Sequence, residues 1–149
     1  MKKIILAMAL LASSLCAGAF EFDGIDLNSP YANVTREIAK KGYTYNHDRN
    51  CLQGNCQGVD IFVSINYLDV IKEGMLGQLI VEVPAGGDVK TMYNDVSVIL
   101  NIIYHQIAKD EETVTYLVDN DGTKLILGEK NGYLILTYNT PFYSVKRSK

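Results

Sequence analysis

The densest group of chemically capable side chains lies between His47 and Cys56. It contains the run His47-Asp48-Arg49-Asn50-Cys51, and His105 is the only other histidine in the chain. Imidazole and thiolate groups are the ligands that zinc prefers, and an imidazole can also act as a general base. A zinc site built from His47, Cys51, Cys56 and His105 is therefore one hypothesis. However, the spacing His47-x3-Cys51-x4-Cys56 does not match the common zinc motifs.

The two cysteines of this group suggest a disulfide. The segment between Cys51 and Cys56 includes Gln53-Gly54-Asn55, which can turn tightly, and an oxidising compartment favours pairing. Closing so short a loop stabilises a fold by roughly 2 kcal/mol in the chain-entropy description. Redox enzymes more often use Cys-x-x-Cys at the start of a helix, whereas four residues separate these cysteines. The sequence thus predicts a structural disulfide, with redox catalysis and metal binding as alternatives.

The sequence shows no motif for catalysis. Neither His47 nor His105 lies in a recognised nucleophile motif, so a hydrolase would need folding to assemble its residues around one of them. Asp119-Asn120-Asp121-Gly122 superficially suggests calcium, but the first and last acids of an EF-hand loop are missing. We therefore expect a protein that is not an enzyme and that carries no metal or cofactor.

The N-terminus predicts export. Lys2 and Lys3 precede an apolar run that is too short to span a bilayer, and Ala17-Gly18-Ala19 offers small residues at a cleavage site. Residues 1–19 are thus expected to form a signal peptide, and the mature protein is expected to be periplasmic or secreted. Lipidation at Cys16 is the alternative, but Leu15 occupies the position where lipoprotein signals carry a small residue.

Charge and length limit the classes of partner. Without Lys2 and Lys3, 12 basic and 17 acidic residues remain, a net charge of −5. An acidic chain without a long basic run argues against nucleic acid as a partner. Residues 20–149 are enough for one domain, and no later segment is long enough for a membrane-spanning helix.

Capping residues and periodicity predict the elements of the first half. Ser29 as N-cap, Pro30 in the first turn and Gly42 at the end delimit a helix with an apolar stripe. Alternation of apolar and polar residues then predicts strands at 59–67 and 79–83. Tyr43 and Tyr45 indicate a shorter strand directly after the helix.

The second half repeats this order. Asp88 is a plausible N-cap for a helix that runs to about Ile107, although β-branched residues at 96–103 leave a strand as an alternative. Strands are predicted at 114–118, 124–127 and 133–138, because Asp-Gly and Asn-Gly turns separate them. The predicted fold class is α+β, with two helices packed on one face of an antiparallel sheet. A duplicated α-β-β-β unit is a further hypothesis.

One N-terminal segment carries a family resemblance. It consists of Phe22-Asp23-Gly24-Ile25-Asp26-Leu27, the helical stretch 29–39, and the exit Gly42-Tyr43. This segment resembles the repeat start of small secreted bacterial α+β proteins, a class that includes the β-lactamase-inhibitor-protein fold and small outer-membrane lipoproteins that assist β-barrel assembly. The resemblance implies a binding or scaffolding role without catalysis, and it places no functional residue in this chain.

These observations together predict a non-catalytic binding domain that acts on another envelope or extracellular macromolecule. Because loops carry contacts, the expected surface includes Tyr45, His47, Asp48 and Arg49, together with the face of the sheet. The chain has ten tyrosines and no tryptophan, and tyrosines on an exposed sheet face would form an aromatic recognition surface. A periplasmic carrier that holds an apolar or aromatic ligand between sheet and helices is the alternative. A small hydrolase that uses His47 or His105 comes third.

Overall fold

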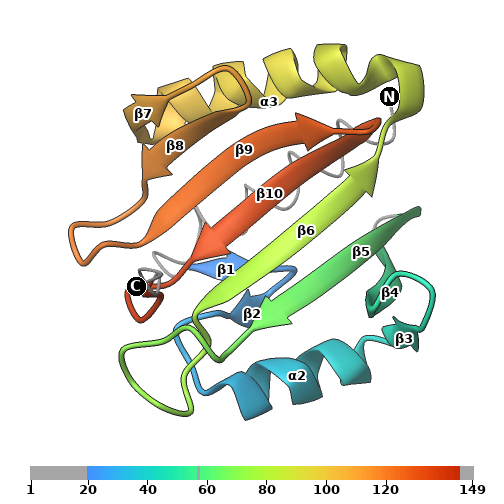
Figure 1. Cartoon of the computed structure of the whole chain (residues 1–149), viewed down its shortest axis with the longest axis vertical. Coiled ribbons are helices and arrows are strands. Elements are labelled where there is room, and N and C mark those ends of the chain that lie inside the picture. The colour runs from blue at the N-terminus through green and yellow to red at the C-terminus, as the bar shows by residue number, and fades with distance from the viewer. Residues whose placement is uncertain (1–19, 57, 145–149) are drawn as a thin grey trace, which may run out of the picture.

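Eight antiparallel strands form the main sheet of the protein, in the order β3-β4-β5-β6-β10-β9-β8-β7 (Figure 1). The structure is a computed structural model and describes residues 20–56 and 58–144. The strands are β3 (Thr44–Asn46), β4 (Cys51–Cys56), β5 (Val59–Asn66), β6 (Gln78–Pro84), β7 (His105–Lys109), β8 (Thr113–Leu117), β9 (Lys124–Lys130) and β10 (Tyr133–Asn139). The predicted signal peptide, the lipidation alternative at Cys16 and the last five residues, 145–149, lie outside the described residues.

A short hairpin precedes the main sheet and forms a second, two-stranded sheet. Its strands are β1 (Glu21–Phe22) and β2 (Ile25–Asp26). Asp23 and Gly24 both have positive φ angles, 50° and 78°, as a two-residue type I′ turn requires. The Phe22 ring lies 6.1 Å from the ring of Tyr138 on β10, so the hairpin packs against the centre of the main sheet (Figure 1).

The first helix, α2 (Tyr31–Lys40), follows the predicted boundaries closely. Val34 and Ile38 are buried because they lie one turn apart on the same helical face. Gly42 has a φ of 92°, the left-handed conformation expected just after a helix. The predicted cap by Ser29 is wrong: its hydroxyl donates a hydrogen bond to the carbonyl of Asp26, 2.6 Å away, and Pro30 takes the N-cap position.

The second helix, α3 (Val89–Ile103), follows a single 3-10 turn, η1 (Gly86–Asp88). Met92, Val96 and Leu100 are buried, whereas Val98 and Ile102 are exposed, as the helical pattern predicts. The alternative of a strand at 96–103 is therefore excluded. The predicted end near Ile107 is wrong, because the backbone becomes extended at Tyr104 and continues as β7, which pairs with β8.

The predicted loop at Cys51–Cys56 is instead the strand β4. Leu52 pairs with Val63 and Cys56 pairs with Val59, so the segment is extended along β5. Five steps of an extended strand separate the two α-carbons by about 16 Å, more than twice the reach of a disulfide. Both thiols are free and buried. The predicted disulfide is therefore not formed, because ladder hydrogen bonds to β5 hold this segment straight.

Along β5, β6, β8 and most of β10, buried and partly exposed side chains alternate, so the buried ones share one face. They join the buried residues of both helices and of the β1–β2 hairpin in one core cluster, to which the buried Cys51 and Asn139 do not belong. The residues between them point to the opposite side, which we call the second face of the sheet. Phe62, Glu82 and Tyr133 lie there, and all three are partly exposed. The predicted strands at 59–67, 79–83, 114–118, 124–127 and 133–138 are confirmed to within two or three residues at each end.

Each helix is followed by four strands, where three were predicted. Strands β3 to β6 form one meander, β7 to β10 form another, and the last strands of the two meanders pair with each other. Helix α3 contacts β9 and β10, and helix α2 contacts β2. In residues 20–56 and 58–144 no helix is both long and apolar enough to cross a membrane.

Candidate functional site

Four of the predicted contact residues lie in or beside the turn between β3 and β4. Asn46 pairs with Cys51 across the hairpin, and Asn50 turns the chain in a left-handed conformation with φ 51°. The Tyr45 hydroxyl donates a hydrogen bond to Oδ1 of Asn50, and the His47 ring stands edge-on to the Tyr45 ring at 4.7 Å. The turn is thus organised by its own side chains.

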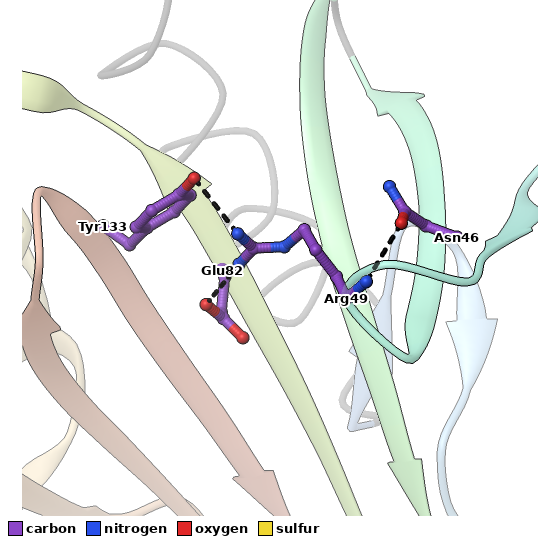
Figure 2. Close-up of polar contacts among 4 residues, drawn as sticks. All are labelled: Asn46, Arg49, Glu82 and Tyr133. Atoms are coloured by element: carbon purple, nitrogen blue, oxygen red, sulfur yellow. Dashed lines mark hydrogen bonds and ion pairs between the residues drawn. The ribbon is translucent and has the colours of Figure 1, made fainter.

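Arg49 extends from this turn across the second face of the sheet (Figure 2). Its guanidinium carbon lies 4.1 Å from the ring centroid of Phe62 and 4.8 Å from that of Tyr133. One terminal nitrogen donates to the Tyr133 hydroxyl at 3.3 Å, and the other lies 3.1 Å from Oε2 of Glu82. The backbone N–H of Arg49 donates to Oδ1 of Asn46 at 3.1 Å, which orients the start of the side chain.

The strand registers bring the partners of Arg49 together. Phe62 on β5 lies directly opposite Glu82 on β6, and Tyr133 on β10 pairs with Pro84, two residues further along β6. The rings of Phe62 and Tyr133 are 6.2 Å apart and steeply inclined. We call Arg49, Phe62, Glu82 and Tyr133 the arginine cluster. It connects the hairpin turn to three strands at the middle of the sheet.

The arginine cluster is suited to binding. The side chains of Arg49 and Glu82 are 33% and 28% exposed, so their ion pair contributes about 1 kcal/mol or less to stability. A guanidinium over an aromatic face contributes roughly 0.5–2 kcal/mol, and more as water is excluded. The cluster therefore presents two aromatic rings, a planar cation and a carboxylate in fixed positions, and each retains some accessible surface.

The other predicted site residues are not brought together. His47 and Asp48 are exposed in the β3–β4 turn, whereas His105 begins β7 at the opposite edge of the sheet. With a strand spacing of about 4.8 Å, the two edges lie roughly 30 Å apart. The zinc set of the sequence hypothesis is thus divided. In the described ranges, no three residues of the types His, Cys, Asp and Glu form a group that could hold a metal ion.

Cys56 lies in a protected position beside Tyr43 and Asp23. Burial, followed by the negative charge of Asp23, raises the pKa of the Cys56 thiol to about 11. Burial also raises the pKa of Tyr43, whose ring covers Gly54 so closely that an added Cβ would lie 2.5 Å from it. A thiol that stays protonated at neutral pH is a poor nucleophile. This corner of the fold is packed rather than reactive.

Sequence reasoning missed Phe62, Glu82 and Tyr133 as members of the site. In the alternating pattern of β5, Phe62 lies on the face of the sheet that does not carry the buried residues. An aromatic residue on that polar face is the feature of the sequence that could have indicated the site. Nothing in the sequence indicates that Arg49 meets Tyr133, 84 residues away.

Comparisons of the chain with protein-family models, curated proteins and solved structures gave no match.

Proposed function

We propose that this protein is an exported, non-catalytic binding domain that recognises another envelope or extracellular macromolecule. Its contact surface would comprise the second face of the sheet and the β3–β4 turn, with the arginine cluster at the centre. The predicted signal peptide supports the expected location. The family resemblance of residues 22–43 supports a role in binding or scaffolding.

The proposed architecture leaves one sheet face available. Buried residues of α2 and α3 join the same core cluster as the inward residues of the strands, which supports packing of both helices on one face. The two meanders, each preceded by a helix and joined at β6 and β10, support a duplicated unit of one helix and four strands. On this proposal the second face is free of helices, and its partly exposed side chains include Ile80, Ile126 and Ile135.

The observation that carries the proposal is the geometry of Arg49. Arginine and tyrosine are the residues, with tryptophan, that most often dominate the energy of an interface. Here the long Arg49 side chain is already held by two rings, a hydroxyl and a carboxylate. A partner would therefore lose little additional side-chain entropy on binding.

The two alternatives have less support. An internal carrier needs space between helices and sheet, but the residues there form one contiguous cluster in which many side chains have no exposed surface. A hydrolase that uses His47 or His105 needs a cleft around one of them, whereas both side chains are exposed near opposite edges of the sheet.

A pull-down with crosslinking tests the proposal. Tagged protein comprising residues 20–149 would be incubated with native envelope and secreted fractions, and the captured macromolecule would then be purified and titrated. Arg49→Ala and Tyr133→Ala are each expected to weaken its binding at least tenfold, because both side chains lie at the centre of the proposed surface. The matched control is Lys109→Ala on the edge strand β7, which should bind like the unmodified protein.

Two results would contradict the proposal. The first is a captured partner whose affinity is unchanged by both Arg49→Ala and Tyr133→Ala. The second is turnover of a substrate by the purified protein that disappears in His47→Ala or His105→Ala. Circular dichroism of each variant would separate loss of binding from loss of fold.

A further inference from the structure

The loop between β5 and β6 carries two surface hollows that share a wall. One hollow has a volume of about 450 Å³ and is lined by Tyr31, Tyr67, Leu68, Val70, Glu73 and Gly74. The other has a volume of about 420 Å³ and is lined by Ile65, Asn66, Tyr67, Leu68 and Asp69. Tyr67 and Leu68 belong to both. Each hollow is large enough for a small organic ligand.

Aromatic and aliphatic side chains gather at this loop. The rings of Tyr31 and Tyr67 are stacked, with centroids 4.2 Å apart and planes inclined by 13°. Tyr67 is 42% exposed and Leu68 is 71% exposed. An exposed flat ring beside an exposed aliphatic group is well suited to a planar apolar ligand.

Backbone hydrogen bonds hold the loop in place. The N–H of Tyr31 donates to the carbonyl of Gly74 at 3.0 Å, and that of Ile71 donates to the carbonyl of Phe142 at 2.8 Å. Val70 also forms a β-bridge with Tyr143. These bonds connect the loop both to the start of α2 and to the C-terminal segment. The hollows are therefore preformed, which reduces the entropy lost when a ligand binds.

Among the residues that the structure describes, the charged side chains that line the two hollows are both negative. Glu73 lines the first hollow, and Asp69, which accepts a hydrogen bond from the Asn66 amide, lines the second. Lys72, between them in sequence, lines neither hollow, and its ammonium group lies 6.0 Å from the ring centroid of Phe142. An anionic ligand would be repelled from these surfaces, whereas a cationic group would be attracted.

We propose that these hollows form a binding site for a small ligand that combines a flat aromatic ring with a positively charged amine. The ring lies against Tyr67 and Leu68, and the amine lies near Glu73. This site shares no residue with the arginine cluster, and the inference does not depend on the proposed function.

A pair of indole compounds tests the proposal. The chain contains no tryptophan, so indole fluorescence reports on the ligand alone. Tryptamine and indole-3-propionate carry the same ring and differ in the sign of their charge at neutral pH. Titration of each compound with the protein, residues 20–149, is expected to give a saturable rise in anisotropy for tryptamine and binding at least tenfold weaker for indole-3-propionate.

Variants locate the site. Tyr67→Ala is expected to weaken tryptamine binding at least tenfold, and Glu73→Gln is expected to reduce the preference for tryptamine over indole-3-propionate to less than threefold. Both side chains are exposed, so the fold should be retained. Glu111→Gln is the matched control for charge and Ile102→Ala the control for apolar surface. The proposal is overturned if tryptamine does not bind, if both compounds bind equally, or if neither Tyr67→Ala nor Glu73→Gln changes its binding.

Discussion

Arg49 shows how much of the candidate site depends on individual side chains. Its guanidinium contacts Phe62, Glu82 and Tyr133, which come from three strands. A lysine at this position would keep the charge but lose the planar group that lies over two rings and donates in two directions. The site is therefore specified by residue type as well as by charge.

The thiol of Cys56 makes a residue-scale prediction about pH. Its pKa of about 11 in the folded protein exceeds the ordinary thiol value of about 8.5 to 9. The unfolded chain thus loses the proton first as pH rises, so the free energy of unfolding should fall between pH 8 and pH 10. When the folded protein keeps the Cys56 proton up to pH 10, the free energy of unfolding decreases by about 1.5 kcal/mol at that pH. Urea denaturation under reducing conditions would measure it.

Two variants control this measurement. Cys56→Ala removes the titrating group and should show a flatter dependence on pH, even if it is less stable throughout. Cys51→Ala keeps the Cys56 thiol and should retain the decline. Equal slopes for Cys56→Ala and the unmodified protein would contradict the assignment of this effect to Cys56.

At the scale of elements, the junction between α3 and β7 is the region that the sequence described least well. Ile103 and Ile107 both fit the helical pattern, yet Tyr104 is extended and β7 begins at His105. The turn after β7 stabilises the strand. Asp110 accepts hydrogen bonds from the N–H groups of Glu112 and Thr113, and these bonds lower the pKa of its carboxyl. They favour a β7–β8 hairpin over another helical turn.

Helix α3 gives a prediction about its two faces. Leu100 has no exposed surface, so Leu100→Ala should lower the free energy of unfolding by about 2–5 kcal/mol through lost burial and a cavity. Ile102 is 80% exposed, so Ile102→Ala should change the free energy of unfolding by less than about 0.5 kcal/mol. Urea denaturation of both variants measures the difference. Similar decreases in the free energy of unfolding for the two variants would contradict the assignment of Leu100 to the buried face of α3 and of Ile102 to its exposed face.

The whole molecule joins two meanders through one pair of strands. All seven residues of β6 pair with β10, from Gln78 opposite Asn139 to Pro84 opposite Tyr133. The buried residues of both halves also form one cluster. Without the other half, β6 would keep only β5 as a partner and β10 only β9, and each would expose an open edge. The two halves should therefore be thermodynamically coupled.

Coupling of the halves predicts a single unfolding transition. Native-state hydrogen exchange should give the same global opening free energy for the most protected amides of β5 in the first half and of β9 in the second. These values should also match the free energy from urea denaturation. A difference of more than about 2 kcal/mol between the halves would contradict a single cooperative unit.

Much of the element structure could be predicted from sequence because local physics decides it. The alternation at 59–66 and 78–84 places every second side chain on one face, whichever strands lie alongside. The Asn131-Gly132 turn has positive φ at both residues, as its sequence requires. The two cysteines of the segment 51–56 predict a closed loop, and this prediction is wrong. Pairing with β5, a tertiary contact, straightens the segment into a strand.

The sequence by itself thus determined the α+β class, the two helices and most strands of the sheet, since caps, turns and periodicity act within a few residues. Only the tertiary structure decided how these elements meet: the joining of β6 to β10, the separation of His47 from His105, and the positions of Phe62, Glu82 and Tyr133 around Arg49. The physical reason is that strand order depends on which long-range pairings bury the most apolar surface at the least loop-closure cost. That balance belongs to the whole chain and cannot be read from any local segment.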